Sequence, residues 1–229
     1  MIKTKQIQAR LDELYRLVGE LADEFVLVGG SAIPFFITDA GAPDVRMTAD
    51  VDVVVEVASR TKYLEIEEKL QRSGFAHDIA SGINCRFING SLIIDVMPTD
   101  EDILGFGNRW YVRAFEQPQI FQTPAGTSIR VVDLALFVCM KLEAFAQRGE
   151  ENQKDLEDIL ALVNGRRSLA DDLESTSAEL KAFIVSQIID LIANKTVMQD
   201  LEQYMPYGFN DIGRLKIIRE RLQNIADLA

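Results

Sequence analysis

Residues 46–57 read RMTADVDVVVEV, a valine-rich run that carries aspartate at positions 50 and 52. Successive side chains of a strand point to opposite faces, so Asp50 and Asp52 share one face and the valines that alternate with them share the other. The run therefore predicts a buried strand that holds two carboxylates a few ångströms apart. Either the face of the aspartates is exposed to water, or a positive group holds the pair together.

Helical and strand patterns alternate on both sides of this run. Apolar residues at helical spacing predict a helix over residues 4–23, and FVLV (residues 25–28) predicts a buried strand that ends at Gly29-Gly30. Ser31 is placed to cap a helix over residues 31–40. Further along, the expected elements are a helix over 61–74, two strands over 84–90 and 91–98 that form a hairpin joined by Asn89-Gly90, and a strand over 127–132.

From Asp133 onward the pattern is helical almost without interruption. Amphipathic helices are expected over residues 133–149 and 152–165, and two or three more over 178–229, interrupted at MPYGFND (residues 205–211). We therefore predict an α/β (α+β) fold. A mixed sheet flanked by helices is expected in residues 1–130, followed by an all-helical domain in residues 131–229.

Composition narrows the classes of function. The 229 residues are 48% hydrophobic, which is enough for a buried core. The formal net charge of −12 disfavours nonspecific electrostatic binding of nucleic acid over a broad surface. No apolar run is long enough for a membrane span and no signal peptide is evident, so we expect a cytoplasmic protein without a membrane partner. Cys85 and Cys139 lie in core-like segments, which favours buried thiols over a disulfide or a zinc site. With His77 as the only histidine, histidine-dependent catalysis is nearly excluded.

The sequence VGGSAI (residues 28–33) has the chemistry of a phosphate-binding turn. Glycines let a ligand approach the backbone closely, and the start of a helix offers N–H groups, the positive end of its dipole and the Ser31 hydroxyl. Gly29, Gly30 and Ser31 are therefore candidate nucleotide-binding residues. A glycine turn before a capped helix is also common without any ligand, and that alternative stays open here.

A third aspartate, Asp95, lies in SLIIDVMP on a strand face that also carries Ile93 and Met97. An unpaired charge on such a face is costly, so Asp95 needs a cation or a hydrogen-bond donor. If its strand lies beside that of Asp50 and Asp52, three carboxylates meet, and a divalent metal is needed to offset their repulsion. Oxygen-only ligands favour Mg²⁺ or Mn²⁺, the metals of phosphoryl and nucleotidyl transfer.

These motifs resemble the nucleotidyltransferase superfold (DNA polymerase beta-like), which has a GGS or GS turn, an acid pair on one strand and a third acid on a later strand. The toxin-type AbiEii/AbiGii-like branch is the most similar, because its acids follow a pattern like P-R-x-T-x-D-h-D. Arg46 and Thr48 fit that pattern, although Pro43 is displaced by two residues, and the resemblance spans roughly residues 25–162. It implies that Asp50, Asp52 and Asp95 are the catalytic metal ligands.

The same branch carries K-x-x-A-x-x-x-R and then K-D-x-x-D-I in its helical half, and residues 141–148 and 154–159 are similar to these patterns. The resemblance implies that Lys141 is catalytic and reaches the triphosphate of the nucleotide, where positive charge lowers the energy of the transition state. The residues that it implies for binding the nucleotide, besides the glycine turn, are Arg46, Thr48, Arg148, Lys154, Asp155 and Asp158.

A structural alternative exists for this second motif. Lys141 and Arg148 share a helical face and are expected, on this alternative, to extend from a packed helix and pair with Glu143 or Glu151. Asp155 and Asp158 would then lie at a solvated helix start, near the positive end of its dipole. Without the resemblance this alternative is the better one.

The resemblance implies a metal-dependent nucleotidyltransferase with NTP as substrate and Mg²⁺ or Mn²⁺ as cofactor. The acceptor is a tRNA end, a protein hydroxyl or a small molecule, and a toxin role would bring an antitoxin protein as partner. Two other classes stay open: a noncatalytic nucleotide-binding or interaction module with the same fold, and a helical scaffold whose C-terminal half binds a partner. Four arginines are candidates for lining an acceptor groove, but scattered surface positions explain them equally well. No role is therefore assigned to Arg86, Arg109, Arg113 and Arg130.

Overall fold

The computed structural model describes residues 2–148, 153–205 and 211–228. The chain forms two compact units. The sheet unit consists of Ile2–Pro34 and Met47–Asp133, and the helical unit consists of Phe35–Arg46 and the described part of Leu134–Ala229. The sequence-based division at residue 130 assigned residues 35–46 to the first domain, whereas their contacts place them with the helices.

The predicted fold class is confirmed: the sheet unit holds a mixed sheet, with seven strands among the described residues. The strands follow the order β3-β4-β5-β2-β1-β7-β6, in which β2 pairs with β5 and β1 with β7 in parallel, and the other pairs are antiparallel. Their bounds are β1 Val26–Val28, β2 Val51–Val55, β3 Ala76–His77, β4 Arg86–Asn89, β5 Leu92–Pro98, β6 Gln119–Gln122 and β7 Ser128–Val131.

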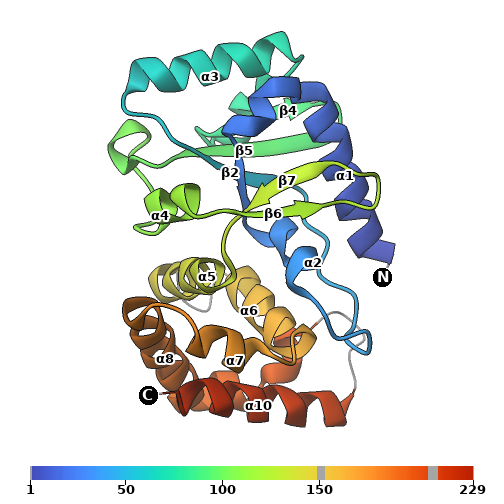
Figure 1. Cartoon of the computed structure of the whole chain (residues 1–229), viewed down its shortest axis with the longest axis vertical. Helices are drawn as coiled ribbons and strands as arrows, with labels where there is room; N and C mark the ends of the chain where they lie inside the picture. Colours follow the sequence, from blue (N-terminus) through green and yellow to red (C-terminus); the bar gives the residue numbers. More distant parts are fainter. Residues whose placement is uncertain (1, 149–152, 206–210, 229) are drawn as a thin grey trace. The chain divides into compact units, whose positions relative to one another are not determined.

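Helices cover both faces of this sheet. The bounds of its helices are α1 Ile2–Val18, α3 Arg60–Arg72 and α4 Tyr111–Glu116, with short 3₁₀ turns η1 Gly19–Glu24, η3 Ile79–Ser81 and η4 Glu101–Ile103. Ser59 caps the start of helix α3, because its hydroxyl accepts a hydrogen bond from the Lys62 N–H. On its buried face the Tyr63 hydroxyl donates to the Val96 carbonyl at 2.7 Å, and burial raises the pKa of Tyr63. Helix α4 lies on the opposite side of the sheet, with the Tyr111 hydroxyl 3.1 Å from the Met97 sulfur (Figure 1).

The hairpin of β4 and β5 is confirmed, but its turn lies one residue later than the sequence predicts. Asn89 still pairs with Leu92, so the two turn residues are Gly90 and Ser91 instead of Asn89 and Gly90. Gly90 has φ +59 at the first turn position, where a type II′ hairpin turn needs glycine. This register sets Arg86 directly opposite Asp95.

The helical unit holds no strand among its described residues. The bounds of its helices are α5 Leu134–Arg148, α6 Gln153–Gly165, α7 Leu169–Glu174, α8 Ala178–Ala193, α9 Lys195–Gln199, η5 Leu201–Tyr204 and α10 Ile212–Ala226. Apolar side chains such as Leu136, Leu156, Ile184 and Leu222 are fully buried. Most of the predicted interruption at residues 205–211 lies outside the described residues.

The segment of residues 35–46 is held by hydrogen bonds to the helices. The N–H groups of Thr38 and Asp39 donate to the Gly165 carbonyl at 2.9 and 2.8 Å. A Cβ at Gly165 would overlap the side chain of Ile37, so the close approach depends on glycine. The Asp39 carboxylate accepts from Arg214 at 2.8 Å, and this hydrogen bond lowers the pKa of Asp39 to about 2.

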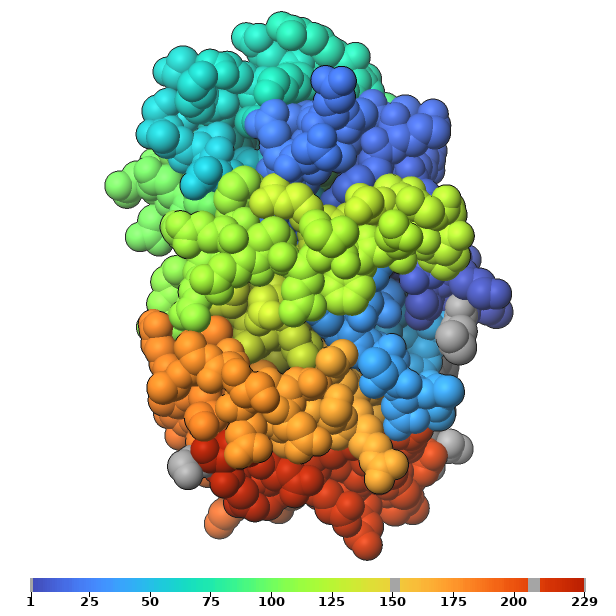
Figure 2. All heavy atoms as spheres, viewed as in Figure 1, coloured from blue at the N-terminus to red at the C-terminus, as the bar shows by residue number. Residues whose placement is uncertain are grey.

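Side chains fill the spaces that the ribbon leaves between the elements of the sheet unit (Figure 2). The alternating valines 51, 53 and 55 of β2 are buried, as predicted. Cys85 and Cys139 are both buried thiols, as the sequence predicts. Within the described ranges, no helix has the length and apolar composition that a membrane crossing requires.

Candidate functional site

The three predicted acids lie on one face of two neighbouring strands. Strands β2 and β5 run in parallel with Asp52 directly beside Asp95. Residues directly opposite each other on neighbouring strands point to the same face of a sheet. Asp50 precedes β2 and falls on that face by the alternation of the chain. The register therefore gathers carboxylates from two distant segments of the sequence, as the sequence predicts.

A cation that the sequence did not identify lies between these acids. The Arg86 guanidinium donates to both carboxylate oxygens of Asp95, from Nε at 2.8 Å and from Nη2 at 2.7 Å. The same Nη2 donates to Asp50 at 2.7 Å. Hydrogen bonding to Asp95, followed by the charges of Asp95 and Asp50, raises the pKa of Arg86, against the effect of burial. One guanidinium thus offsets part of the negative charge that the three carboxylates place on this face.

The donor atoms suit a divalent metal, but the acids are not arranged around one. Asp50, Asp52 and Asp95 supply only hard oxygen ligands, which fit Mg²⁺ or Mn²⁺. Across the residues that the structure describes, however, no group of three or more His, Cys, Asp or Glu side chains is placed to hold a metal ion. The position of Arg86 accounts for this difference, because two of the three carboxylates point to its guanidinium.

The glycine turn is fastened to the strand of the acids. The Ser31 hydroxyl lies 2.9 Å from the Thr48 hydroxyl and donates to the Asp50 carbonyl at 3.1 Å. Arg10 of α1 donates to the carbonyls of Thr48 and Ala49 at 2.5 and 3.0 Å, which fixes the same loop from the other side. Hydrogen bonds therefore join two motifs that are separated in the sequence, next to the acids.

The prediction that Ser31 caps a helix over residues 31–40 is wrong. A 3₁₀ turn η2, Gly30–Ala32, leads into the short helix α2, Ile33–Phe36. The residue before η2 is Gly29, with no side-chain cap, and the Ser31 hydroxyl is directed to Thr48 and Asp50 instead. Residues 37–40 follow the end of this helix, and the N–H groups of Thr38 and Asp39 donate to the Gly165 carbonyl.

Gly29 brings the turn against Asp52. Its φ of 62° and ψ of −167° lie in a region that is essentially restricted to glycine. A Cβ at position 29 would overlap the carboxyl group of Asp52. The contact between the turn and the acid pair therefore depends on the missing side chain.

The second predicted motif forms a buried ion network in the helical unit. Lys141 of α5 pairs with Asp155 at 3.1 Å and with Asp158 at 2.7 Å, both on α6. Arg46 also donates to Asp158 at 3.1 Å, and Arg148 lies 3.3 Å from Asp155. The side chains of Asp155 and Asp158 are only 5% and 1% exposed, so their prediction as solvated residues at a helix start is wrong. They are buried because α6 turns this face towards α5.

The ion pairs of Lys141 with Asp155 and Asp158 were not part of the structural alternative. That alternative named Glu143 on the same helix and Glu151, and Glu151 lies outside the described residues. The ion pairs instead reach across to α6, because a lysine on one helix can meet acids on a packed neighbour. Lys154, the remaining member of the motif, is exposed on α6.

Sequence reasoning assigned no role to Arg86, because a scattered surface position explained it equally well, and the predicted hairpin turn did not place it opposite Asp95 either. With a two-residue turn at Asn89-Gly90, the residue opposite Asp95 would be Asn84, whereas the observed turn places Arg86 there. The other three arginines without an assigned role have structural contacts. Arg130 donates to backbone carbonyls of Asp23 and Phe115, Arg109 stacks on the Trp110 ring, and Arg113 lies 3.5 Å from Gln117.

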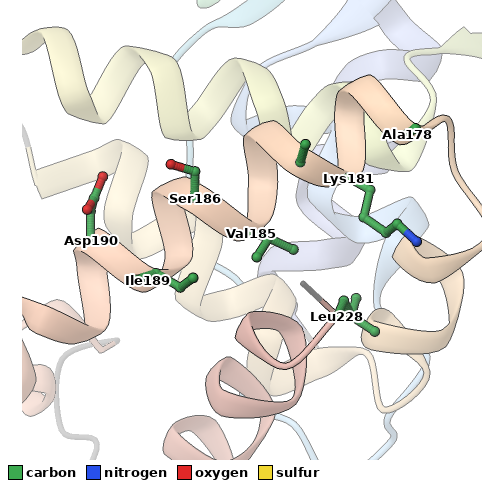
Figure 3. A pocket seen from close by; sticks show the side chains of 8 residues that line it. Ala178, Lys181, Val185, Ser186, Ile189, Asp190 and Leu228 are labelled. Carbon is green, nitrogen blue, oxygen red and sulfur yellow. The ribbon is translucent and has the colours of Figure 1, made fainter.

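Two surface hollows occur away from the predicted residues. A hollow of about 400 Å³ lies along α8, where Val185, Ile189 and Leu228 give it an apolar lining (Figure 3). A second hollow of about 560 Å³ in the sheet unit is lined by Arg60, His77, Asp78, Ile79, Gly82, Ile83, Asn84, Ile103 and Leu104. Neither hollow is lined by Asp50, Asp52 or Asp95.

The predicted residues thus form two groups. The glycine turn, Thr48 and the three acids lie together in the sheet unit, with Arg86 among them. Arg46, Lys141, Arg148, Asp155 and Asp158 lie together in the helical unit. No protein-family model matches this chain, and no curated protein matches it either.

Proposed function

We propose that this protein is a metal-dependent nucleotidyltransferase that moves NMP from an NTP to a hydroxyl group. The observation that carries the proposal is the pairing of Asp52 with Asp95 on parallel strands, with Asp50 directed to the same cation as Asp95. Gathering like charges on one face is costly, and a fold that does so is suited to binding cations. The glycine turn fastened beside these acids supports a phosphate-containing substrate.

The acids and the turn take separate roles in this proposal. Asp50, Asp52 and Asp95 would hold Mg²⁺ or Mn²⁺, which when bound activates the acceptor hydroxyl and stabilises the leaving pyrophosphate. Gly29 and Gly30 let the phosphates of the NTP approach the backbone. Ser31 and Thr48 are positioning residues, because their hydroxyls hold the turn against the loop of Asp50.

Basic residues of the buried ion network are proposed to supply positive charge to the triphosphate. Lys141 is proposed to act on the triphosphate, where a cation stabilises charge that develops in the transition state. Asp155 and Asp158 hold its ammonium group and limit the positions that it can take. The remaining proposed nucleotide-binding residues are Arg46, Arg148 and Lys154.

The acceptor is proposed only as a class, namely a molecule with a free hydroxyl group. A tRNA end, a protein side chain and a small molecule all offer one. The net charge of −12 weakens long-range attraction to RNA, so an RNA acceptor would need local basic residues. An antitoxin protein is a proposed partner, and its binding would be measured separately from catalysis.

Labelled NTPs and Mg²⁺ test the proposal with the full-length protein. Pyrophosphate release and label transfer would be measured across a panel of tRNA, protein and small-molecule acceptors. Asp52→Asn should lower the rate at least about a hundredfold, because it removes a metal ligand. Asp102→Asn, which also removes an acid from the sheet unit but at an exposed position, should match the unmodified protein. Equal rates for Asp52→Asn and the unmodified protein would refute the assignment.

One observation favours a second candidate function, a noncatalytic nucleotide-binding module. Arg86 already pairs with Asp50 and Asp95, so these two carboxylates have a cation partner without a metal. Calorimetry distinguishes the two candidates. Tight NTP binding without Mg²⁺, and without pyrophosphate release over the same acceptor panel, supports the module.

A further inference from the structure

Arg86 uses the oxygen atoms that a metal would need. Both Asp95 oxygens and Asp50 Oδ2 accept hydrogen bonds from its guanidinium at 2.7–2.8 Å. A divalent ion binds carboxylate oxygens at about 2.0–2.6 Å and carries its own positive charge. A guanidinium and a metal ion therefore compete for the same lone pairs, and they repel each other at that distance.

The surroundings of Arg86 favour this competition. Its side chain is 17% exposed, so its ion pairs are partly shielded from water and are stronger than surface pairs. Strand pairing between β4 and β5 fixes its backbone directly opposite Asp95. The flexible side chain can nevertheless turn away from the acids without moving either strand.

We propose that Arg86 is an internal counterion that occupies the acid cluster and admits a divalent metal only when its guanidinium leaves. This inference rests on the proposed function, because it takes Asp50, Asp52 and Asp95 to be metal ligands. In the absence of metal, Arg86 keeps Asp50 and Asp95 together, with Asp52 beside them. The apparent metal affinity is then lowered by the fraction of molecules in which Arg86 has moved away.

Direct measurement of Mn²⁺ binding tests this competition. Calorimetry and the electron paramagnetic resonance signal of free Mn²⁺ would be followed with the full-length protein and without nucleotide. Arg86→Gln should bind Mn²⁺ at least about tenfold more tightly than the unmodified protein, since the competing cation is gone. Adding Asp52→Asn to Arg86→Gln should abolish the gain, which places the bound ion at the acids.

Two further variants complete the test. Arg72→Gln removes the same charge from an exposed position on α3 and should leave Mn²⁺ affinity unchanged. Arg86→Lys keeps a positive charge but loses the forked geometry, so it should give a smaller gain than Arg86→Gln. If Arg86→Gln does not fold, a gain in Arg86→Lys supports the inference and an unchanged affinity overturns it.

The outcomes separate the inference from the proposed function. Equal or weaker Mn²⁺ binding by a folded Arg86→Gln overturns the role of Arg86, even if the unmodified protein transfers nucleotides. Tighter binding that depends on Asp52 supports the role of Arg86, even if no variant transfers a nucleotide to any acceptor. In the latter case only the proposed function fails.

Discussion

Gly29 is the residue on which the glycine turn depends most directly. Its backbone has φ 62° and ψ −167°, and a Cβ there would overlap the Asp52 carboxyl group. Glycine is thus required twice, once for the backbone conformation and once for the close approach. The second requirement links the shape of the turn to the position of a proposed metal ligand.

Gly29→Ala should destabilise the sheet unit by roughly 2–4 kcal/mol, because strain and overlap add. Gly19→Ala is the matched control, since Gly19 has φ 57° but open space around its Cα. Gly19→Ala should lower the free energy of unfolding by only about 1 kcal/mol. Urea unfolding followed by the fluorescence of Trp110, which lies in the sheet unit, measures both changes. Similar losses in the two variants would show that the overlap with Asp52 is unimportant.

Helix α6 is the element that carries the buried acids of the helical unit. Asp155 and Asp158 are three residues apart, so they lie on one helical face, and that face packs against α5. Their charge is balanced by Lys141, with Arg46 and Arg148 at the sides. Such a network contributes little net stability when complete, but removing one member leaves a buried charge without its balance.

Asp158→Ala should therefore cost roughly 3 kcal/mol or more of unfolding free energy. Lys141 and Arg46 would both lose a carboxylate that is 1% exposed. Glu157→Ala removes the neighbouring acid, which is 27% exposed and also pairs with Arg46, and should cost less than about 1 kcal/mol. Urea unfolding followed by circular dichroism compares the two. A loss for Asp158→Ala as small as the control's would contradict a buried network.

At the scale of the whole molecule, the path of the chain links the two units more than once. It enters the helical unit at residue 35, returns to the sheet unit at residue 47, and enters the helical unit again at residue 134. The inserted segment is bound at Asp39, which accepts hydrogen bonds from Arg214 and Arg221 of α10. One carboxylate therefore ties residues 35–46 to the other end of the sequence.

The contribution of Asp39 to the free energy of unfolding should depend on pH. The folded-state pKa of Asp39 is lowered from 3.8 to about 2, first by its hydrogen bond from Arg214. A lowered carboxyl pKa contributes stability above the unfolded value, and that stability is lost as the pH falls from about 4 to 2. Asp39→Asn should thus be less stable at pH 7, by roughly 1–2 kcal/mol, and should lose less on acidification.

Urea unfolding at several pH values between 2 and 7 measures this difference. Glu202→Gln, which removes an exposed acid from the same unit, is the control. It should follow the unmodified protein across the range. An Asp39→Asn curve parallel to that of the unmodified protein would contradict the role of this carboxylate.

The sequence by itself determined most elements and the face on which each acid lies. Periodicity in residues 46–57 predicted both β2 and the shared face of Asp50 and Asp52, since alternation is a local property of an extended chain. Helices α5 and α6 follow in the same way from apolar spacing. The meeting of Asp95 with the pair was expected only if their strands are neighbours, as the resemblance implies, and β5 does lie beside β2. The need of Asp95 for a cation or a donor was predicted from the residues, because an unpaired charge on an apolar strand face is costly.

Only the tertiary structure decided what balances these charges. Arg86 meets Asp95 because of a hairpin register set by Gly90 and Ser91, and it meets Asp50 because β5 lies beside β2. The burial of Asp155 and Asp158 and the placement of residues 35–46 likewise depend on elements far away in the sequence. A local pattern reports which face of an element is apolar. The neighbour that covers that face is fixed only when the whole chain packs.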